Sequence, residues 1–302
     1  MFATKPTNNR VLYFATGSTT ASRVYGQGGD FSTATSNKGG ISATSLNTPT
    51  GVALDSSGGL YVSDNLNNRV LYFATGSTTA SRVYGQNGNF ATNTIGCSAT
   101  SFYKPIHVAL DSSGGIYVSD RDNNRVLYFA TCSTTASRVY GQGGDFTTRT
   151  FNKGGISATS FYGPLGVTLD SSGGIYVSDR DNHRVLYFAT GSTTASRVYG
   201  QGGDFTTGTF NKGGISATSF YVPSGVTLDS SGGLYVSDTF TNRVLYFATG
   251  STTASRVYGQ DDVFPTGTSN KGGKSATHTS LYYPYGVALD WIVVGGFMLP
   301  TI

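Results

Sequence analysis

Apolar and polar positions along this chain follow one pattern that recurs at a nearly constant interval. The run Val70–Gln86, VLYFATGSTTASRVYGQ, occurs again letter for letter three times, and a fifth copy differs only at Cys132. The other copies are Val11–Gln27, Val126–Gln142, Val185–Gln201 and Val244–Gln260. The Arg that precedes each copy recurs at spacings of 59, 56, 59 and 59 residues. The pattern therefore predicts a repeat protein in which each unit packs on its neighbours.

Each period contains four short apolar runs separated by Gly, Ser, Asn and Asp. In one period they are Gly51–Asp55, Leu60–Asp64, Arg69–Ala74 and Ser81–Gln86. Short runs rich in Val, Tyr, Phe and Leu, bounded by turn-forming residues, are typical of β-strands. We therefore expect four antiparallel strands per repeat, which is the layout of a propeller blade.

The connections between these runs differ in length and chemistry. Asp55–Gly59 reads Asp-Ser-Ser-Gly-Gly and predicts a tight hairpin turn, because Asp bonds nearby backbone and Gly accepts positive φ. The fourth run leads to the next repeat through a long loop such as Gly28–Pro49. We expect a recurring Phe, together with Phe102 before Tyr103, to hold such loops against the sheet. The recurring residues are Phe31, Phe90, Phe146, Phe205 and Phe264.

One ordered set of motifs runs from Gly51 to Phe73: Gly-Val-Ala-Leu-Asp, a Gly-Gly turn, Leu-Tyr-Val-Ser-Asp, then Asn-Arg and an apolar strand. This order resembles the NHL repeat family, named for Asn-His-Leu, and it returns along nearly the whole chain. The resemblance implies a β-propeller. The chain departs from the family pattern in its long loop after the fourth strand and in the uniformity of its copies.

The ends of the repeat pattern suggest how the propeller closes. The chain begins at a third strand, Arg10, and its last recognisable first strand is Gly286–Asp290. We expect an all-β fold with one propeller domain over residues 1–302, its five blades closed by N-terminal strands that pair with the C-terminal strand. In the atypical tail, residues 291–302, Ile292–Val294 either supplies the missing second strand or is unrelated to the repeats. The alternative architecture is a fragment of a six-bladed propeller.

Composition narrows the class of protein. Gly contributes 42 residues, Tyr 20 and Phe 18, while charged residues are 12%, which favours an all-β fold over disorder. The formal net charge is +4 without a long basic run, so a nucleic-acid partner is not favoured. No apolar stretch reaches the ~20 residues of a membrane span, so we expect no transmembrane segment. Cys97 and Cys132 are isolated replacements, which argues against a disulfide or a metal site.

Asp and Arg recur together between the second and third strands of the repeats. Each Asp lies five residues before its Arg, as Asp64 does before Arg69. One hypothesis makes these groups a polar ring at one mouth of the channel, where they contact a ligand. The favoured interpretation is structural: the Asp accepts backbone N–H bonds in the turn, and the Arg bridges to it or to a carbonyl. The other pairs are Asp120 and Arg125, Asp179 and Arg184, and Asp238 and Arg243.

A few further residues complete the candidate ligand contacts. They are Arg121, Arg180, His107 and His183. His107 replaces the Gly that opens a first strand, His183 replaces an Asn, and His278 lies in a long loop, so the histidines are inequivalent. Asp120–Asn124 lacks the Gly and the distal Glu of a calcium loop. We therefore expect no catalytic residue, no metal and no cofactor.

The favoured function is a non-catalytic binding or scaffolding propeller that recognises a protein or a glycan on the face where the long loops emerge. The resemblance leaves two alternatives, a metal-assisted propeller enzyme similar to lyases and lactonases, and an RNA-binding NHL domain. An enzyme would need blade-specific polar residues at the channel, and only His107 and His183 qualify. We expect a monomer. Abundant Ser, Thr and Gly favour an extracellular or cell-surface location, whereas Met1–Asn9 shows no signal peptide, so the location stays open.

Overall fold

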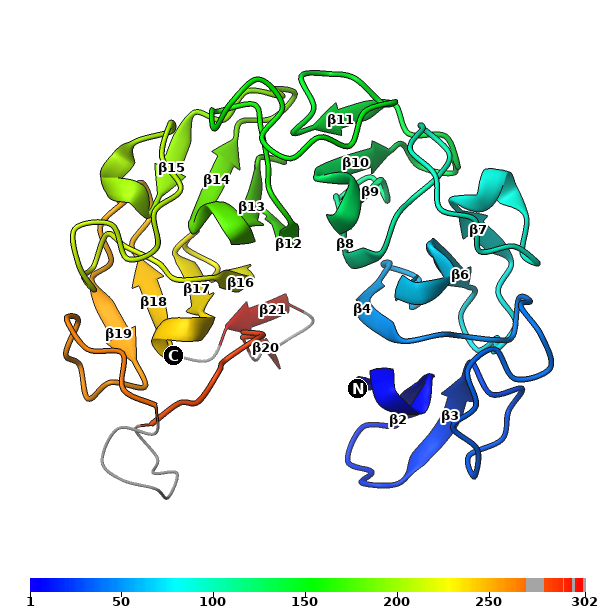
Figure 1. Ribbon diagram of the computed structural model, residues 1–302. Coiled ribbons are helices and arrows are strands. Elements are labelled where there is room, and N and C mark those ends of the chain that lie inside the picture. Colours follow the sequence, from blue (N-terminus) through cyan, green and yellow to red (C-terminus); the bar gives the residue numbers. More distant parts are fainter. Residues whose placement is uncertain (270–279, 290, 295–296, 301–302) are drawn as a thin grey trace. The chain divides into compact units, whose positions relative to one another are not determined.

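The computed structural model describes residues 1–269, 280–289, 291–294 and 297–300. The described chain is built from β-strands with short 3₁₀ turns between them (Figure 1). It divides into two compact units, residues 1–150 and 151–302. Among the described residues, no helix has the length and the apolar surface needed to cross a membrane.

The first unit, described over its whole length, contains three antiparallel sheets whose strands follow one another in sequence. Its first sheet has three strands and the other two have four each. The sheets are β1 (Phe2–Lys5), β2 (Arg10–Phe14) and β3 (Ala21–Tyr25); β4 (Pro49–Leu54), β5 (Leu60–Asp64), β6 (Arg69–Phe73) and β7 (Arg82–Tyr84); and β8 (Pro105–Leu110), β9 (Ile116–Asp120), β10 (Arg125–Phe129) and β11 (Arg138–Tyr140).

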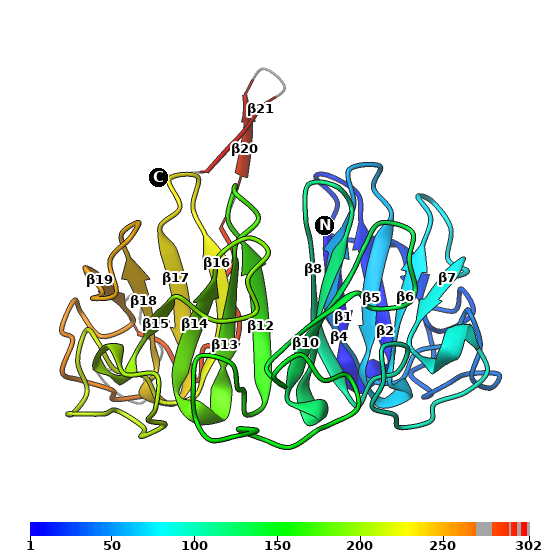
Figure 2. The same ribbon diagram turned by 90° about the horizontal axis from the view of Figure 1, so that it is seen from above.

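The described part of the second unit repeats this plan in two four-stranded sheets and adds a two-stranded sheet. Figure 2 shows the strands of each sheet side by side within the unit. The sheets are β12 (Pro164–Leu169), β13 (Ile175–Asp179), β14 (Arg184–Phe188) and β15 (Arg197–Tyr199); β16 (Pro223–Leu228), β17 (Leu234–Asp238), β18 (Arg243–Phe247) and β19 (Arg256–Tyr258); and β20 (Trp291–Val294) and β21 (Phe297–Pro300).

The predicted all-β propeller class with four-stranded antiparallel blades is confirmed. The five blade-type sheets among the described residues match the expected number, although the N-terminal one has three strands. Closure of the ring stays a prediction, as do the single domain and the six-bladed alternative. Gly286–Leu289 is described without strand structure, and Asp290 and His278 lie outside the described residues.

The expectation that the chain begins at a third strand was wrong. β1 pairs with β2 so that Phe2 faces Tyr13 and Lys5 faces Arg10, the register in which Tyr61 faces Tyr72 in the next sheet. Residues Phe2–Lys5 therefore form the second strand of the N-terminal blade. Sequence reasoning missed it because Lys5 stands where the other repeats have Asp, whereas pairing depends on backbone hydrogen bonds and on apolar contacts.

The tail does not supply that second strand. Ile292–Val294 lies in β20, which pairs with β21 in a two-stranded sheet of its own. β1 already occupies the position that Ile292–Val294 was expected to fill.

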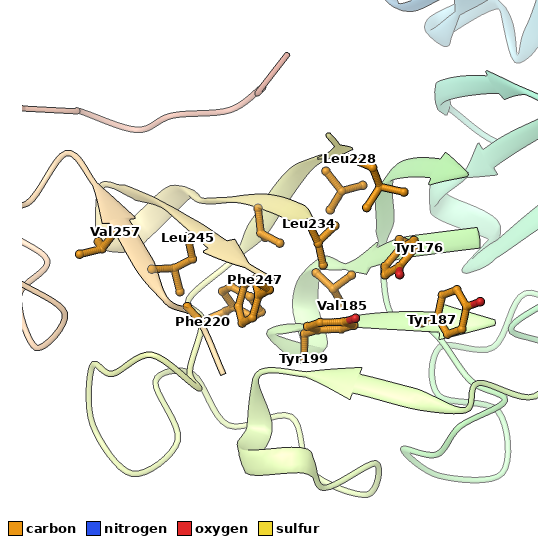
Figure 3. Packing of buried hydrophobic residues seen from close by; sticks show 13 residues of the cluster. Tyr176, Val185, Tyr187, Tyr199, Phe220, Leu228, Leu234, Leu245, Phe247 and Val257 are labelled. Atoms are coloured by element: carbon orange, nitrogen blue, oxygen red, sulfur yellow. The ribbon is translucent and has the colours of Figure 1, made fainter. Parts of the chain in front are cut away.

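The core lies between neighbouring blades. In the second unit, Tyr176, Val185 and Tyr199 of one blade pack with Leu234 and Phe247 of the next (Figure 3). The centroids of the Tyr199 and Phe247 rings lie 5.2 Å apart, and the rings pack edge to face. Burying one such side chain contributes roughly 1.5–3 kcal/mol. Each blade therefore depends on its neighbour for stability, as expected for stacked repeats.

The Phe residues that were expected to anchor the long loops are buried to different extents. Phe102 and its equivalents Phe161 and Phe220 are fully buried, as expected. The other recurring loop Phe residues are partly buried, except Phe31, which is exposed. The expected anchoring of the loops is therefore carried mainly by the residue at the Phe102 position.

Candidate functional site

The recurring Asp and Arg meet at the end of each blade where the second strand turns into the third. The 3₁₀ turn Asn65–Asn67 reverses the chain and brings Asp64 opposite Arg69. Asp64 Oδ2 accepts hydrogen bonds from Arg69 Nε and from Asn67 Nδ2, both at 2.8 Å. Asp64 Oδ1 accepts one from the backbone N of Asn47 at 2.6 Å. The expected bridge from the Arg is therefore present, whereas the backbone N–H that the Asp accepts comes from the loop before β4 and not from the turn.

The guanidinium of Arg69 also binds two different long loops. Its Nη2 donates to the carbonyl oxygens of Ser42 and Ser45 at 2.9 Å, in the loop before β4. Its Nη1 donates to the carbonyl oxygen of Phe90, in the loop after β7. Arg125, Arg184 and Arg243 make the same set of contacts in their own repeats. Each Arg thus fixes two loops to one blade, so the long loops and these turns lie at the same end of the sheets.

Burial sets the electrostatics of these pairs. The side chains of Asp64 and Arg69 have no exposed area, and the same holds for the other three pairs. Burial raises the pKa of each Asp carboxyl, while the partner Arg and the hydrogen bonds act in the opposite direction. The charges are compensated and the polar atoms are bonded, which a buried ion pair requires. These residues can influence a ligand only through the loops that they hold.

A buried Gln at the end of the fourth strand run adds a second anchor. Gln86 Nε2 donates to the carbonyl oxygens of Asn68 and Thr94, and its Oε1 accepts from the backbone N of Thr94. The signal that could have identified it is a polar residue at the end of every VYGQ copy, directly after an apolar strand. The following copies keep the bond to the loop through Gln142, Gln201 and Gln260.

Arg121 and Arg180 are the predicted Arg contacts that reach solvent. Each begins the 3₁₀ turn of its blade and pairs with the next residue in the chain. Arg121 Nε lies 3.6 Å from Asp122 Oδ1, and Arg180 Nη1 lies 2.8 Å from Asp181 Oδ1. Their role as ligand contacts stays a prediction.

His183 stands where the other repeats have Asn and accepts the equivalent backbone hydrogen bond. Its Nδ1 accepts a hydrogen bond from the backbone N of Val222 at 3.2 Å, where Asn68 Oδ1 accepts from the backbone N of Lys104. Because Nδ1 accepts, the neutral imidazole carries its hydrogen on Nε2. Burial lowers the pKa of His183 below its usual value. Its ring also contacts Tyr221, with centroids 5.4 Å apart.

The other histidine with a described position lies in the first unit. His107 is in β8, at the position that Gly51 occupies in β4. Burial lowers the pKa of His107 to about 4, so the ring is neutral at physiological pH. Over the described ranges, no three His, Cys, Asp or Glu side chains are placed to hold a metal ion. Cys97 and Cys132 are both free thiols.

The second unit carries a row of aromatic side chains, most of them exposed, that the sequence analysis did not identify. Ring centroids lie 4.9 Å apart for Phe210 and Tyr221, 5.1 Å for Tyr221 and Phe240, and 5.2 Å for Phe240 and Tyr283. Tyr282 extends the row at 4.5 Å from Tyr283. We call these five residues the aromatic row. The available signal was their position in the repeat, where the first complete repeat has Ser36, Asn47, Leu66 and Thr48.

Comparisons with known proteins support the blade type. The NHL repeat family model matches residues 46–73, 102–129 and 161–188. A comparison with curated proteins found no match.

Several solved structures are similar to this chain at low identity. Virginiamycin B lyase from Staphylococcus aureus is 14% identical over 67% of this chain and 53% of that chain, with a TM-score of 0.41. Kuenenia stuttgartiensis hydrazine synthase is 13% identical over 71% of this chain and 53% of that chain, with a TM-score of 0.47. A Bacteroides caccae protein of unknown function is 9% identical over 67% of this chain and 64% of that chain, with a TM-score of 0.43. The chain thus spans 53–64% of the length of these structures, and likeness of fold does not transfer an activity. The three matched segments are NHL repeats, and each of them contains one of the buried Asp–Arg turns.

Proposed function

We propose that this chain is a non-catalytic binding propeller that recognises a protein or glycan partner at the loop ends of its blades. The single observation that supports this most directly is the double anchoring of the long loops. Each buried Arg binds carbonyl oxygens of two loops, and each buried Gln adds a further bond. Loops held in one conformation lose little entropy on binding, which favours recognition.

The chemistry of the loop ends suits binding better than catalysis. The Asp and Arg that recur in the repeats have their charged atoms in hydrogen bonds inside the blade, as Asp179 and Arg184 show. The side chains left for a partner include Ser, Thr, Asn and aromatic residues of the loops, together with the exposed Arg149 and the paired Arg180. Such groups donate hydrogen bonds and offer apolar surface, which suits recognition of a partner.

The experiment compares two matched sets of variants of the full chain. Thr150→Glu with Thr209→Glu places charges on exposed side chains of the long loops. Ser112→Glu with Ser171→Glu places the same charges on exposed hairpin turns at the opposite ends of the blades. Ligands are first selected from an immobilised glycan panel and a displayed peptide library. Affinities of both variants are then measured by calorimetry.

We expect the loop variant to lose about tenfold or more in affinity, equivalent to ~1.4 kcal/mol, and the hairpin variant to bind like the parent. Loss of binding only in the hairpin variant would place recognition at the other end of the blades and refute the proposal. Failure of both panels to yield a ligand would also count against it.

A further inference from the structure

The aromatic row is unusual because four of its five members are exposed although they contact one another, while Tyr221 is half-buried. The exposed fractions are 58% for Phe210, 40% for Phe240, 61% for Tyr282 and 47% for Tyr283. Large apolar side chains that gather on a surface, without being buried in a core, commonly mark an interaction site. The row therefore needs an explanation other than folding.

The row joins three segments that are distant in sequence. Phe210 and Tyr221 come from the loop between β15 and β16, Phe240 from the turn between β17 and β18, and Tyr283 from the segment after β19. The equivalent positions around the first complete repeat hold Ser36, Asn47, Leu66 and Thr48, so the repeat fold does not require aromatic residues there.

The backbone beneath the row is held by hydrogen bonds. The backbone N of Tyr221 donates to Asp238 Oδ1 at 2.7 Å, and the backbone N of Phe240 donates to the Tyr221 carbonyl oxygen at 3.1 Å. The backbone N of Tyr283 donates to Asn242 Oδ1 at 3.0 Å. The rings are therefore presented from fixed positions, which lowers the entropy lost on binding.

Two described cations next to the row are paired with carboxylates. Arg180, in the turn that leads to His183, lies 2.8 Å from Asp181, and Lys212, two residues after Phe210, lies 2.9 Å from Asp204. His183 itself is held neutral by its lowered pKa and its accepted hydrogen bond. Cations already engaged in ion pairs are poor partners for nucleic acid phosphates, which proteins bind with free Lys and Arg.

Polar hydrogen-bonding groups lie among the rings. Tyr221, Tyr282 and Tyr283 carry phenol hydroxyls, and His183 carries its hydrogen on Nε2 beside Tyr221. A pyranose sugar has an apolar C–H face that packs on an aromatic ring and a rim of hydroxyls that exchange hydrogen bonds. Three of the four adjacent ring pairs stand at 82° to 89°, and the Phe210–Tyr221 pair stands at 32°, so most of the row presents faces and edges in alternation and not the parallel walls of a proline-binding groove.

We propose that the aromatic row, together with His183, binds a neutral oligosaccharide by stacking sugar rings on its exposed faces. This inference rests on the proposed function and names the ligand class for it. Tyr hydroxyls and His183 Nε2 would donate to sugar hydroxyls, and no charge on the sugar is required.

The chain supplies its own replacements for a test. Phe210→Ser and Phe240→Leu install the residues that the first unit carries at the equivalent positions, Ser36 and Leu66. Phe151→Ser is the matched control, because Phe151 occupies the same repeat position as Phe210, is 57% exposed, and stacks on Tyr162. Melting temperatures of all variants show whether each remains folded.

The probes are neutral gluco-, xylo-, manno- and galacto-oligosaccharides, a proline-rich peptide and a single-stranded RNA, each titrated into the full chain. We expect binding to at least one neutral oligosaccharide, little changed by salt. Phe210→Ser and Phe240→Leu should each weaken it about tenfold or more, and Phe151→Ser less than about twofold.

Binding of the peptide or the RNA in place of every sugar would overturn the ligand class. Equal losses of oligosaccharide affinity in Phe210→Ser and Phe151→Ser would overturn the assignment of the binding site to the aromatic row. If no sugar binds but a protein partner is lost in the Thr150→Glu and Thr209→Glu variant, the inference fails and the proposed function stands. If no ligand of any class binds at the loop ends, both the inference and the proposed function fail.

Discussion

Replacing Asp179 by alanine removes the carboxylate at the centre of a fully buried network in the second unit. Asp179 Oδ2 accepts hydrogen bonds from Arg184 Nε at 2.7 Å and from Asn182 Nδ2 at 2.8 Å, and Oδ1 accepts one from the backbone N of Tyr162 at 2.7 Å. The variant leaves the Arg184 guanidinium buried without a counter-charge. Removing one partner of a buried ion pair costs about 3–5 kcal/mol. We expect a loss of that size in the free energy of unfolding, a large part of the ~5–15 kcal/mol typical of a folded protein.

Urea titration followed by circular dichroism measures this loss, and Asp170→Ala is the matched control in the same blade. Asp170 is partly exposed in the β12–β13 hairpin turn, where its Oδ1 accepts from the backbone N atoms of Ser172 and Gly174. Losing exposed turn bonds of this kind costs about 1 kcal/mol. If Asp179→Ala proves no more costly than Asp170→Ala, the argument that the buried carboxylate holds the blade is refuted.

The same variant should also loosen the loops that Arg184 holds. Arg184 donates to the carbonyl oxygens of Ser157 and Ser160 in one loop and of Phe205 in the next. Without Asp179 to orient the guanidinium, limited proteolysis should cut these two loops faster than in the parent. Unchanged cleavage rates would show that the loops do not depend on the ion pair.

Other predictions concern single positions. Lys5→Asp should raise the free energy of unfolding by about 1 kcal/mol, because it offers a carboxylate to Arg10 Nε, a buried atom without a partner; an unchanged urea midpoint would contradict this. The pKa of His183 is lower in the folded chain than in the unfolded chain, so below pH 6.5 the unfolded chain binds a proton more readily. The free energy of unfolding should therefore fall as the pH drops from 6.5 towards the folded-state pKa. His183→Asn should remove this component of the pH dependence, and identical pH profiles would argue against it. Burial raises the pKa of the Cys97 thiol, so Cys97 should react with a thiol reagent more slowly than the exposed Cys132, which mass spectrometry of the labelled peptides can check.

Much of the blade was predictable from local sequence. The four strands of each repeat follow from short apolar runs between turn residues, and Leu60–Asp64 has the predicted bounds. The Asp–Arg contact was also accessible, because five residues and one tight turn place Asp64 opposite Arg69. These features depend on hydrogen bonds and side-chain faces over short chain distances, which the residue pattern encodes directly.

The partners of that Arg required the folded chain. Arg69 binds carbonyl oxygens 21 to 27 residues away in two loops, and carbonyls carry no signature in the sequence. The strand Phe2–Lys5 was also missed, because its partner strand and not its own residue pattern defines it. The aromatic row was missed for the same reason: its rings come from three segments and meet only after the blades pack. Local periodicity specifies how a segment is built, whereas which distant segments meet depends on packing that no short stretch of sequence contains.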